Sequence, residues 1–95
     1  MEEVYEIVYE EAVFKHDLPQ MSEIERTRIQ KNIVEKLKTA PEHFGKPLRY
    51  SLKNTRSLRV GNCRVLYHLK GKLVTVYAIF RRNEGYKDFE SRLDP

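Results

Sequence analysis

The sequence predicts an α+β fold in which a helix hairpin packs on one face of a small, mostly antiparallel sheet. The expected order is β-α-α-β-β-β with a short C-terminal helix, forming a single domain over residues 1–95. Two observations support this order. The early run VYEIVY is rich in β-forming residues and precedes two segments with helical spacing of apolar residues. The second half then contains three β-rich runs joined by short turns with glycine.

The first strand is expected over residues 4–9, and a short helix follows it. Pro19 limits this helix, because proline lacks the amide hydrogen and disfavours helical geometry in the residue before it. The expected apolar face of the helix consists of Val13, Phe14, Leu18 and Met21.

A second helix should begin at Ser22, because Ser22 followed by Glu25 forms a capping-box pattern. It should end near Thr39, since Pro41 cannot continue it. Its expected apolar stripe is Ile29, Ile33, Val34 and Leu37. Its charged face carries Glu25, Arg28, Lys31, Glu35 and Lys38. The two helices therefore form a hairpin whose apolar side needs a sheet.

Residues 41–47, PEHFGKP, are expected to form a loop because of their two prolines and glycine. A strand lies within residues 48–60 and is clearest in SLRV. Gly61-Asn62 and Lys70-Gly71 are expected to form tight turns that connect it to strands over residues 63–69 and 73–80. The last strand is apolar on both faces, which is typical of a central strand. Helical spacing in the tail, at Tyr86, Phe89 and Leu93, predicts the closing helix.

Several functional classes fit the composition poorly. No run of about 18 apolar residues is present to cross a membrane. The acidic N-terminal segment is unlike a secretory signal, so a cytoplasmic location is expected. The single cysteine cannot form an internal disulfide. His16, His43 and His68 are scattered and lack metal-binding spacing, so neither a metal nor a cofactor is expected.

The net charge of +4 conceals a strong asymmetry along the chain. Residues 1–45 hold 6 Lys or Arg and 10 Asp or Glu, whereas residues 46–95 hold 12 and 4. Residues 43–83 contain ten basic residues and no acidic one. A solvated basic face would explain this pattern, but soluble surfaces usually mix both signs. The asymmetry favours an anionic partner.

Strand periodicity predicts where the arginines lie. Side chains alternate between the two faces of a strand, so Arg64 and His68 should point away from Val65. Arg59 should likewise point away from the apolar residues beside it. Because the apolar sets must face the helix hairpin, Arg59, Arg64 and His68 are expected on the open face of the sheet. Arg81 and Arg82 should emerge at the end of the last strand, followed by Tyr86, and line the same basic face.

Such a face suits phosphate, because guanidinium groups present paired donors and stay charged when partly desolvated. RNA cleavage needs little more: arginines stabilise charge on the phosphorane, and a tyrosine stacks on a base or relays a proton. Structural alternatives exist, since Arg59 and Arg64 could pair with an acidic neighbour and Tyr86 could close the end of the sheet. His68 shares the face of Arg64, but a lone histidine on a strand is more often inert.

The segment SLRVGNCRVLYHLKGKLVTVYAIFRRNEGY resembles the C-terminal half of the RelE/ParE superfamily, the toxins of type II toxin–antitoxin pairs. The pattern consists of Leu58, Arg59, Val60, Gly61, Arg64, Val65, Tyr67, Arg82 and Tyr86. The helix hairpin and the GKPL loop extend the resemblance over nearly the whole chain. It implies a partner, the cognate antitoxin, and in the RelE branch a metal-independent cleavage of mRNA on the ribosome.

By this resemblance, Arg64, Arg82 and Tyr86 would be the catalytic residues. Arg64 would stabilise the transition-state phosphate, Arg82 would do the same or assist the leaving oxygen, and Tyr86 would stack on the base or share the proton work. The expected RNA contacts are Arg59, Arg81, Lys53, Arg56 and His68.

The sequence departs from the pattern at one place. Some members carry two lysines in the strand before the Leu-Arg pair, one of them acting as general base, where this chain has Thr55 and Ser57. A neighbouring residue, His68 or Tyr86 would have to replace it, or catalysis would be weak. Two other functions stay open: the ParE branch poisons DNA gyrase without catalysis, and a plain nucleic-acid-binding module would need only the charge. Retention of Arg82 and Tyr86 favours the nuclease.

Overall fold

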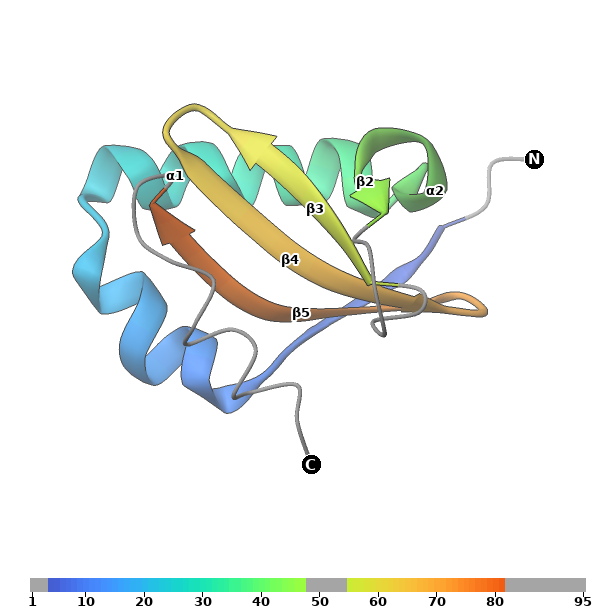
Figure 1. The fold of residues 1–95 in the computed structure, drawn as a ribbon, viewed down its shortest axis with the longest axis horizontal. Coiled ribbons are helices and arrows are strands. Elements are labelled where there is room, and N and C mark those ends of the chain that lie inside the picture. Colours follow the sequence, from blue (N-terminus) through green and yellow to red (C-terminus); the bar gives the residue numbers. More distant parts are fainter. Residues whose placement is uncertain (1–3, 48–54, 82–95) are drawn as a thin grey trace.

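The computed structural model describes residues 4–47 and 55–81 and shows helices packed on one face of a five-stranded sheet of order β1-β5-β4-β3-β2 (Figure 1). The strands are β1 (Glu6–Tyr9), β2 (Lys46–Pro47), β3 (Thr55–Val60), β4 (Cys63–Lys70) and β5 (Leu73–Arg81). β1 pairs with β5 in parallel, and the other neighbours are antiparallel. The predicted α+β class is confirmed, while the expected closing helix lies outside the described residues.

The chain path explains the one parallel pair. From β1 the chain crosses over the sheet through the helices, which is the kind of long connection that parallel strands require. It then returns through two hairpins, β3–β4 and β4–β5, whose tight turns contain Gly61 and Gly71 as expected. β5 therefore runs parallel to β1 and is hydrogen-bonded on both edges, to β1 and to β4.

The helical layer is less regular than the sequence predicts. The first helix consists of η1 (Val13–Asp17), a wide π-helical turn, and η2 (Leu18–Gln20), which tightens at Pro19. The second begins with α1 (Glu23–Asn32) and widens into η3 (Ile33–Leu37). The loop expected over residues 41–47 is partly helical, which corrects that prediction. α2 (Pro41–Phe44) forms a helical turn there, because proline is well tolerated at the first helical position.

The main core lies between the helices and the sheet and contains Ile33, Leu37, Val65 and Val76 among its buried residues. Part of the expected stripe is wrong, since Val34 is 48% exposed. The backbone bond from the Lys38 amide to the Ile33 carbonyl spans five residues, which marks the wide turn in which Val34 lies. Phe14, expected on the first apolar face, is also exposed.

A β-bulge in β5 changes the alternation of side chains. Leu66 pairs with Ala78, but Tyr67 pairs with Val76, so Tyr77 is an extra residue. Before the bulge Val76 faces the main core, and after it Ile79 does. The Ile79 amide donates to the buried Asp17 carboxylate at 2.9 Å, which attaches β5 to the first helix just beyond the bulge.

The sheet face opposite the helices is not fully open, contrary to expectation. Leu66, Ala78 and Phe80 form a second buried cluster there, with Tyr77 packed against it. Thr55 and Ser57 on the same face are also buried. Of the three basic side chains expected on this face, only Arg59 is exposed, while Arg64 and His68 are partly buried.

Candidate nucleic-acid interface

Arg59 and Arg64 form the centre of the candidate site. They are direct cross-strand partners in the β3–β4 hairpin and lie on the face opposite the helices, as expected. Arg64 Nη1 is 3.4 Å from Ser57 Oγ. Within residues 4–47 and 55–81, neither guanidinium forms an ion pair with a carboxylate. Like charges placed directly opposite are unfavourable, so an anion bound between them would relieve their repulsion.

His68 lies further along β4 on the same face. Its ring makes an edge-to-face contact with Tyr77, with centroids 5.9 Å apart and planes at 64°. Burial raises the pKa of the Tyr77 hydroxyl, and the negative charge of Glu10 adds to the effect. This pair offers aromatic surface on the same strand as Arg64, four residues further along it.

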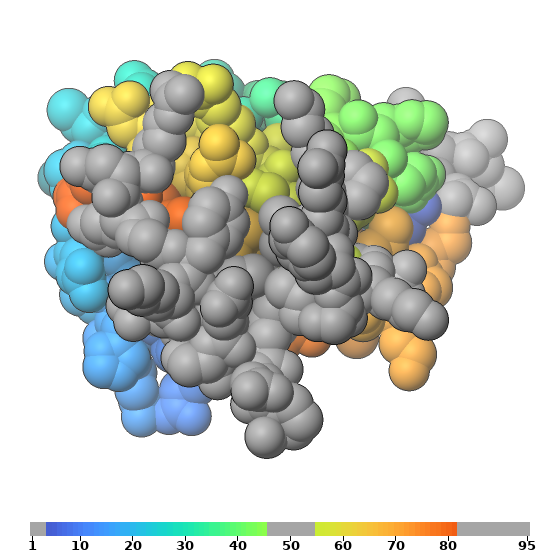
Figure 2. Space-filling model, in the orientation of Figure 1, coloured from blue at the N-terminus to red at the C-terminus, as the bar shows by residue number. Residues whose placement is uncertain are grey.

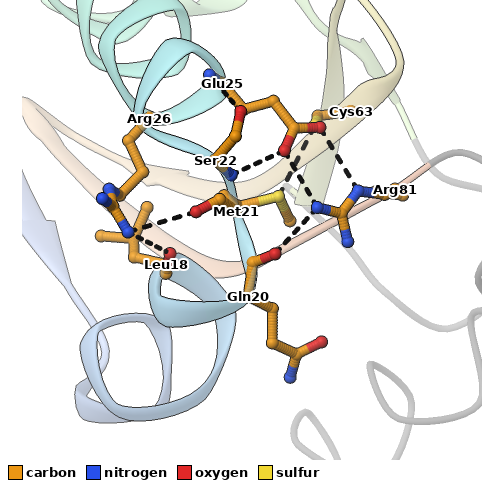
Figure 3. Close-up of polar contacts among 8 residues, drawn as sticks. All are labelled: Leu18, Gln20, Met21, Ser22, Glu25, Arg26, Cys63 and Arg81. Carbon is orange, nitrogen blue, oxygen red and sulfur yellow. Dashed lines mark hydrogen bonds and ion pairs between the residues drawn. The ribbon is translucent and has the colours of Figure 1, made fainter.

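Arg81 does not share this face, so the expectation that it lines the basic surface with Arg64 is wrong. Its guanidinium donates to both carboxylate oxygens of Glu25, at 2.9 and 3.3 Å, and to the Gln20 carbonyl at 2.8 Å (Figure 3). The physical reason is the bulge at Tyr77, which shifts the alternation by one residue and directs Arg81 toward the helices.

Glu25 is the residue that joins α1 to the end of β5. It accepts the Ser22 amide at 2.8 Å within the capping box, while the Ser22 hydroxyl accepts the Glu25 amide at 3.1 Å. The Ser22 amide and then Arg81 lower the pKa of the Glu25 carboxyl to about 2. The capping box was visible in the sequence. The contact with Arg81, 56 residues away, had no local signal.

Arg56 also lies on the helix side, which corrects its expected role as an RNA contact. Its guanidinium donates to the carbonyls of Glu42 and Gly45, at 2.9 and 2.5 Å. Beside it, the Tyr67 hydroxyl donates to the Pro41 carbonyl at 2.6 Å. Arg56 alternates with Ser57 and Arg59 along β3, so it faces the α2 region and holds that turn against the sheet.

The remaining predicted site residues, Lys53, Arg82 and Tyr86, lie outside the described residues. Thr55 and Ser57, at the positions where the resemblance expects lysines, are buried hydroxyl residues on the face of Arg64. The described part of the chain contains no cluster of three His, Cys, Asp or Glu side chains able to hold a metal ion. Nor does any helix in that part have the length and hydropathy to span a membrane.

The described residues thus form an α+β domain with helices on one face of the sheet and, on the other, two arginines without a carboxylate partner in that part of the chain. Residues 11–86 match the family described as the ParE toxin of the type II toxin–antitoxin system parDE. The chain therefore belongs to this family of toxins, within the RelE/ParE superfamily.

Solved structures share the fold. A chain of the RelBE2 toxin–antitoxin complex from Mycobacterium tuberculosis shares 24% sequence identity with this chain and superposes with a TM-score of 0.76. The match covers 85% of this chain and 94% of that one. A mutant of the E. coli toxin RelE in the free state is 14% identical with a TM-score of 0.68, over 95% and 98%. The RelB–RelE complex from Methanococcus jannaschii is 17% identical with a TM-score of 0.64, over 90% and 98%. No curated protein sequence gave a match.

Proposed function

We propose that this toxin is a metal-independent endoribonuclease that cleaves mRNA on the ribosome and so inhibits translation. The observation that carries the proposal is the Arg59–Arg64 pair, two adjacent guanidiniums on rigid strands with no carboxylate partner in the described residues. Guanidinium pairs match the oxygens of a phosphodiester. Preorganised positive charge is most valuable where negative charge develops in a transition state.

The reaction needs no cofactor. The 2′-oxygen of the nucleotide forms a bond to phosphorus while the bond from phosphorus to the 5′-oxygen breaks. A base removes the 2′-hydroxyl proton, and the 5′-oxygen gains a proton as it leaves. In this scheme Arg64 stabilises the charge on the phosphorane and Arg59 holds the adjoining backbone. Arg82 and Tyr86 keep the catalytic roles that the resemblance implies.

His68 is better suited to binding a neighbouring nucleotide than to acting as the base. It lies four residues from Arg64 along β4, which at about 3.3 Å per residue is about 13 Å. At that spacing along the strand the two side chains can contact neighbouring nucleotides. The contact of His68 with Tyr77 presents an aromatic surface on which an unstacked base can lie.

The cognate partner proposed for this chain is an antitoxin, as in the toxin–antitoxin complexes that share its fold. An acidic, amphipathic segment that folds on binding would neutralise the sheet face that carries Arg59 and Arg64, here called the arginine face.

One finding favours a second candidate function. The family that matches residues 11–86 carries the description of the ParE toxin. The resemblance to that branch implies inhibition of DNA gyrase without catalysis. A gyrase poison would keep the fold and the basic face but would cut no RNA.

The test is to add purified toxin to a translating extract and map the ends of the mRNA fragments. The nuclease predicts cuts in ribosome-bound mRNA that leave 5′-hydroxyl and 2′,3′-cyclic phosphate ends. Intact mRNA, together with inhibition of gyrase supercoiling in a parallel assay, would overturn the proposal in favour of the second function.

A further inference from the structure

The six arginines of the described residues divide into two groups. Three have guanidiniums bound by acceptors within the protein: Arg26, Arg56 and Arg81. The other three have no carboxylate or carbonyl partner in the described residues: Arg28, Arg59 and Arg64. The second group includes one helical residue, Arg28, that the sequence pattern places on the solvent-facing side of its helix.

All three arginines lie near the β3–β4 turn, on two sides of it. Arg59 and Arg64 face each other one residue pair before the turn. Arg28 reaches the turn from α1: a Cβ added at Gly61 would lie only 3.1 Å from Arg28 Nη1. Figure 2 shows the surface of this turn, in yellow, next to that of α1, in cyan. Gly61 has φ +58°, so the turn both favours glycine and leaves room for the guanidinium.

The local sequence leaves Arg28 without a helical partner. The carboxylate three residues earlier, Glu25, is bound to Arg81 and Ser22. The residue four positions later is Asn32, a neutral side chain whose Nδ2 donates to the Arg28 carbonyl at 2.9 Å. Helical ion pairs form at these spacings, so the Arg28 charge is not compensated by its own helix.

We propose that Arg28 is a third phosphate contact, and that an RNA strand bound at Arg59 and Arg64 continues over the β3–β4 turn to α1. Arg28 lies on the helix side of the turn, whereas the other two lie on the sheet face. A ligand that reaches all three must carry anions at successive positions along a flexible backbone, as single-stranded RNA does. The choice of RNA as the ligand rests on the proposed function.

The test is the salt dependence of binding to a fluorescein-labelled single-stranded RNA, measured by fluorescence anisotropy from low to moderate NaCl. Each lost phosphate contact should reduce the slope of log affinity against log salt by about 0.7. Arg28→Ala and Arg59→Ala should each reduce it by about that amount. Lys38→Ala removes the same charge from an exposed position at the far end of the second helix and should leave the slope unchanged.

An unchanged slope in Arg28→Ala alongside a reduced slope in Arg59→Ala would overturn the proposal. Failure of the wild-type protein to bind the RNA would overturn it too. If Arg28→Ala weakened binding of the cognate antitoxin but not of RNA, the surface would belong to a protein partner and the RNA assignment would be wrong. A reduced slope in a toxin that cuts no mRNA would support this proposal while refuting the proposed function.

Discussion

Arg56 and Arg59 are three residues apart in β3, yet the structure gives them opposite environments. Arg59 is exposed beside Arg64, and Arg56 faces the helix side and binds two backbone carbonyls. Alternation along a strand decides which arginine is free to meet a ligand. In β5 the bulge shifts this alternation by one residue, so Arg81 points to the helix side and not to the proposed RNA surface.

Arg56→Ala should therefore reduce stability. It removes two charge-assisted hydrogen bonds and should lower the free energy of unfolding by about 2 kcal/mol in a urea titration. The matched variant Arg59→Ala should stay within about 0.5 kcal/mol of wild type, because Arg59 is exposed and makes no internal hydrogen bond in the described residues. Equal stability of the two variants would show that Arg56 does not hold the α2 turn.

Glu25 should make the fold sensitive to acid. Its pKa is lowered from 4.5 to about 2, so the folded state favours the carboxylate. The stability it contributes is complete above about pH 5 and is lost as the pH falls from 4.5 toward 2. Urea unfolding of wild type and Glu25→Gln between pH 2 and 7 should show a difference that is constant near neutrality and shrinks in acid. A difference independent of pH would contradict the lowered pKa, and with it the contributions of the Ser22 amide and of Arg81.

Among the elements, the sequence is most informative where local signals decide the geometry. The Ser22–Glu25 cap, the turn at Gly61 and the pairing of β3 with β4 all follow from spacing and turn chemistry, and all are confirmed. The bulge at Tyr77 and the widening after Asn32 have no such signal. The bulge accounts for the wrong placement of Arg81, and Val34, which lies in the widened turn, is exposed.

The α2–β2 connection offers a test at the scale of an element. A Cβ at Gly45 would lie 2.1 Å from the Tyr67 hydroxyl oxygen, although the Gly45 φ of −94° suits any residue. Gly45→Ala should therefore cost about 1–3 kcal/mol through overpacking alone. Gly71→Ala, with φ +60° and no neighbour within 4 Å, isolates the backbone penalty and should cost about 1–2 kcal/mol. Wild-type stability of Gly45→Ala in urea would refute the close packing.

Across the whole molecule, the two faces of the sheet differ in how their arginines are paired. The helix side contains the main core and the arginines that hold elements together, whereas the opposite face and the adjoining turn carry unneutralised arginines. This division could be predicted from the sequence for Arg59 and Arg64, whose alternation is undisturbed. It could not be predicted for Arg28, whose approach to the turn depends on how α1 crosses the hairpin.

An antitoxin should bind to the arginine face. Its acidic segment is expected to cover part of the surface between residues 53 and 86, because binding there neutralises Arg59 and Arg64, which have no carboxylate partner in the described residues. Chemical-shift mapping of the labelled toxin with its cognate antitoxin would check this. Perturbations confined to residues 1–11 would place the interface elsewhere.

The central claim is that Arg64 stabilises the phosphate during RNA cleavage, and the rate of mRNA cleavage in ribosome complexes tests it most directly. Arg64→Ala should reduce that rate by about 100-fold or more, the usual cost of losing one preorganised donor, while the thermal melt stays near wild type. Arg64→Lys should recover only part, because an ammonium cannot make paired contacts. Lys15→Ala, which breaks an exposed ion pair with Glu11 on the helix side, should have no effect. Full cleavage by Arg64→Ala would contradict the claim.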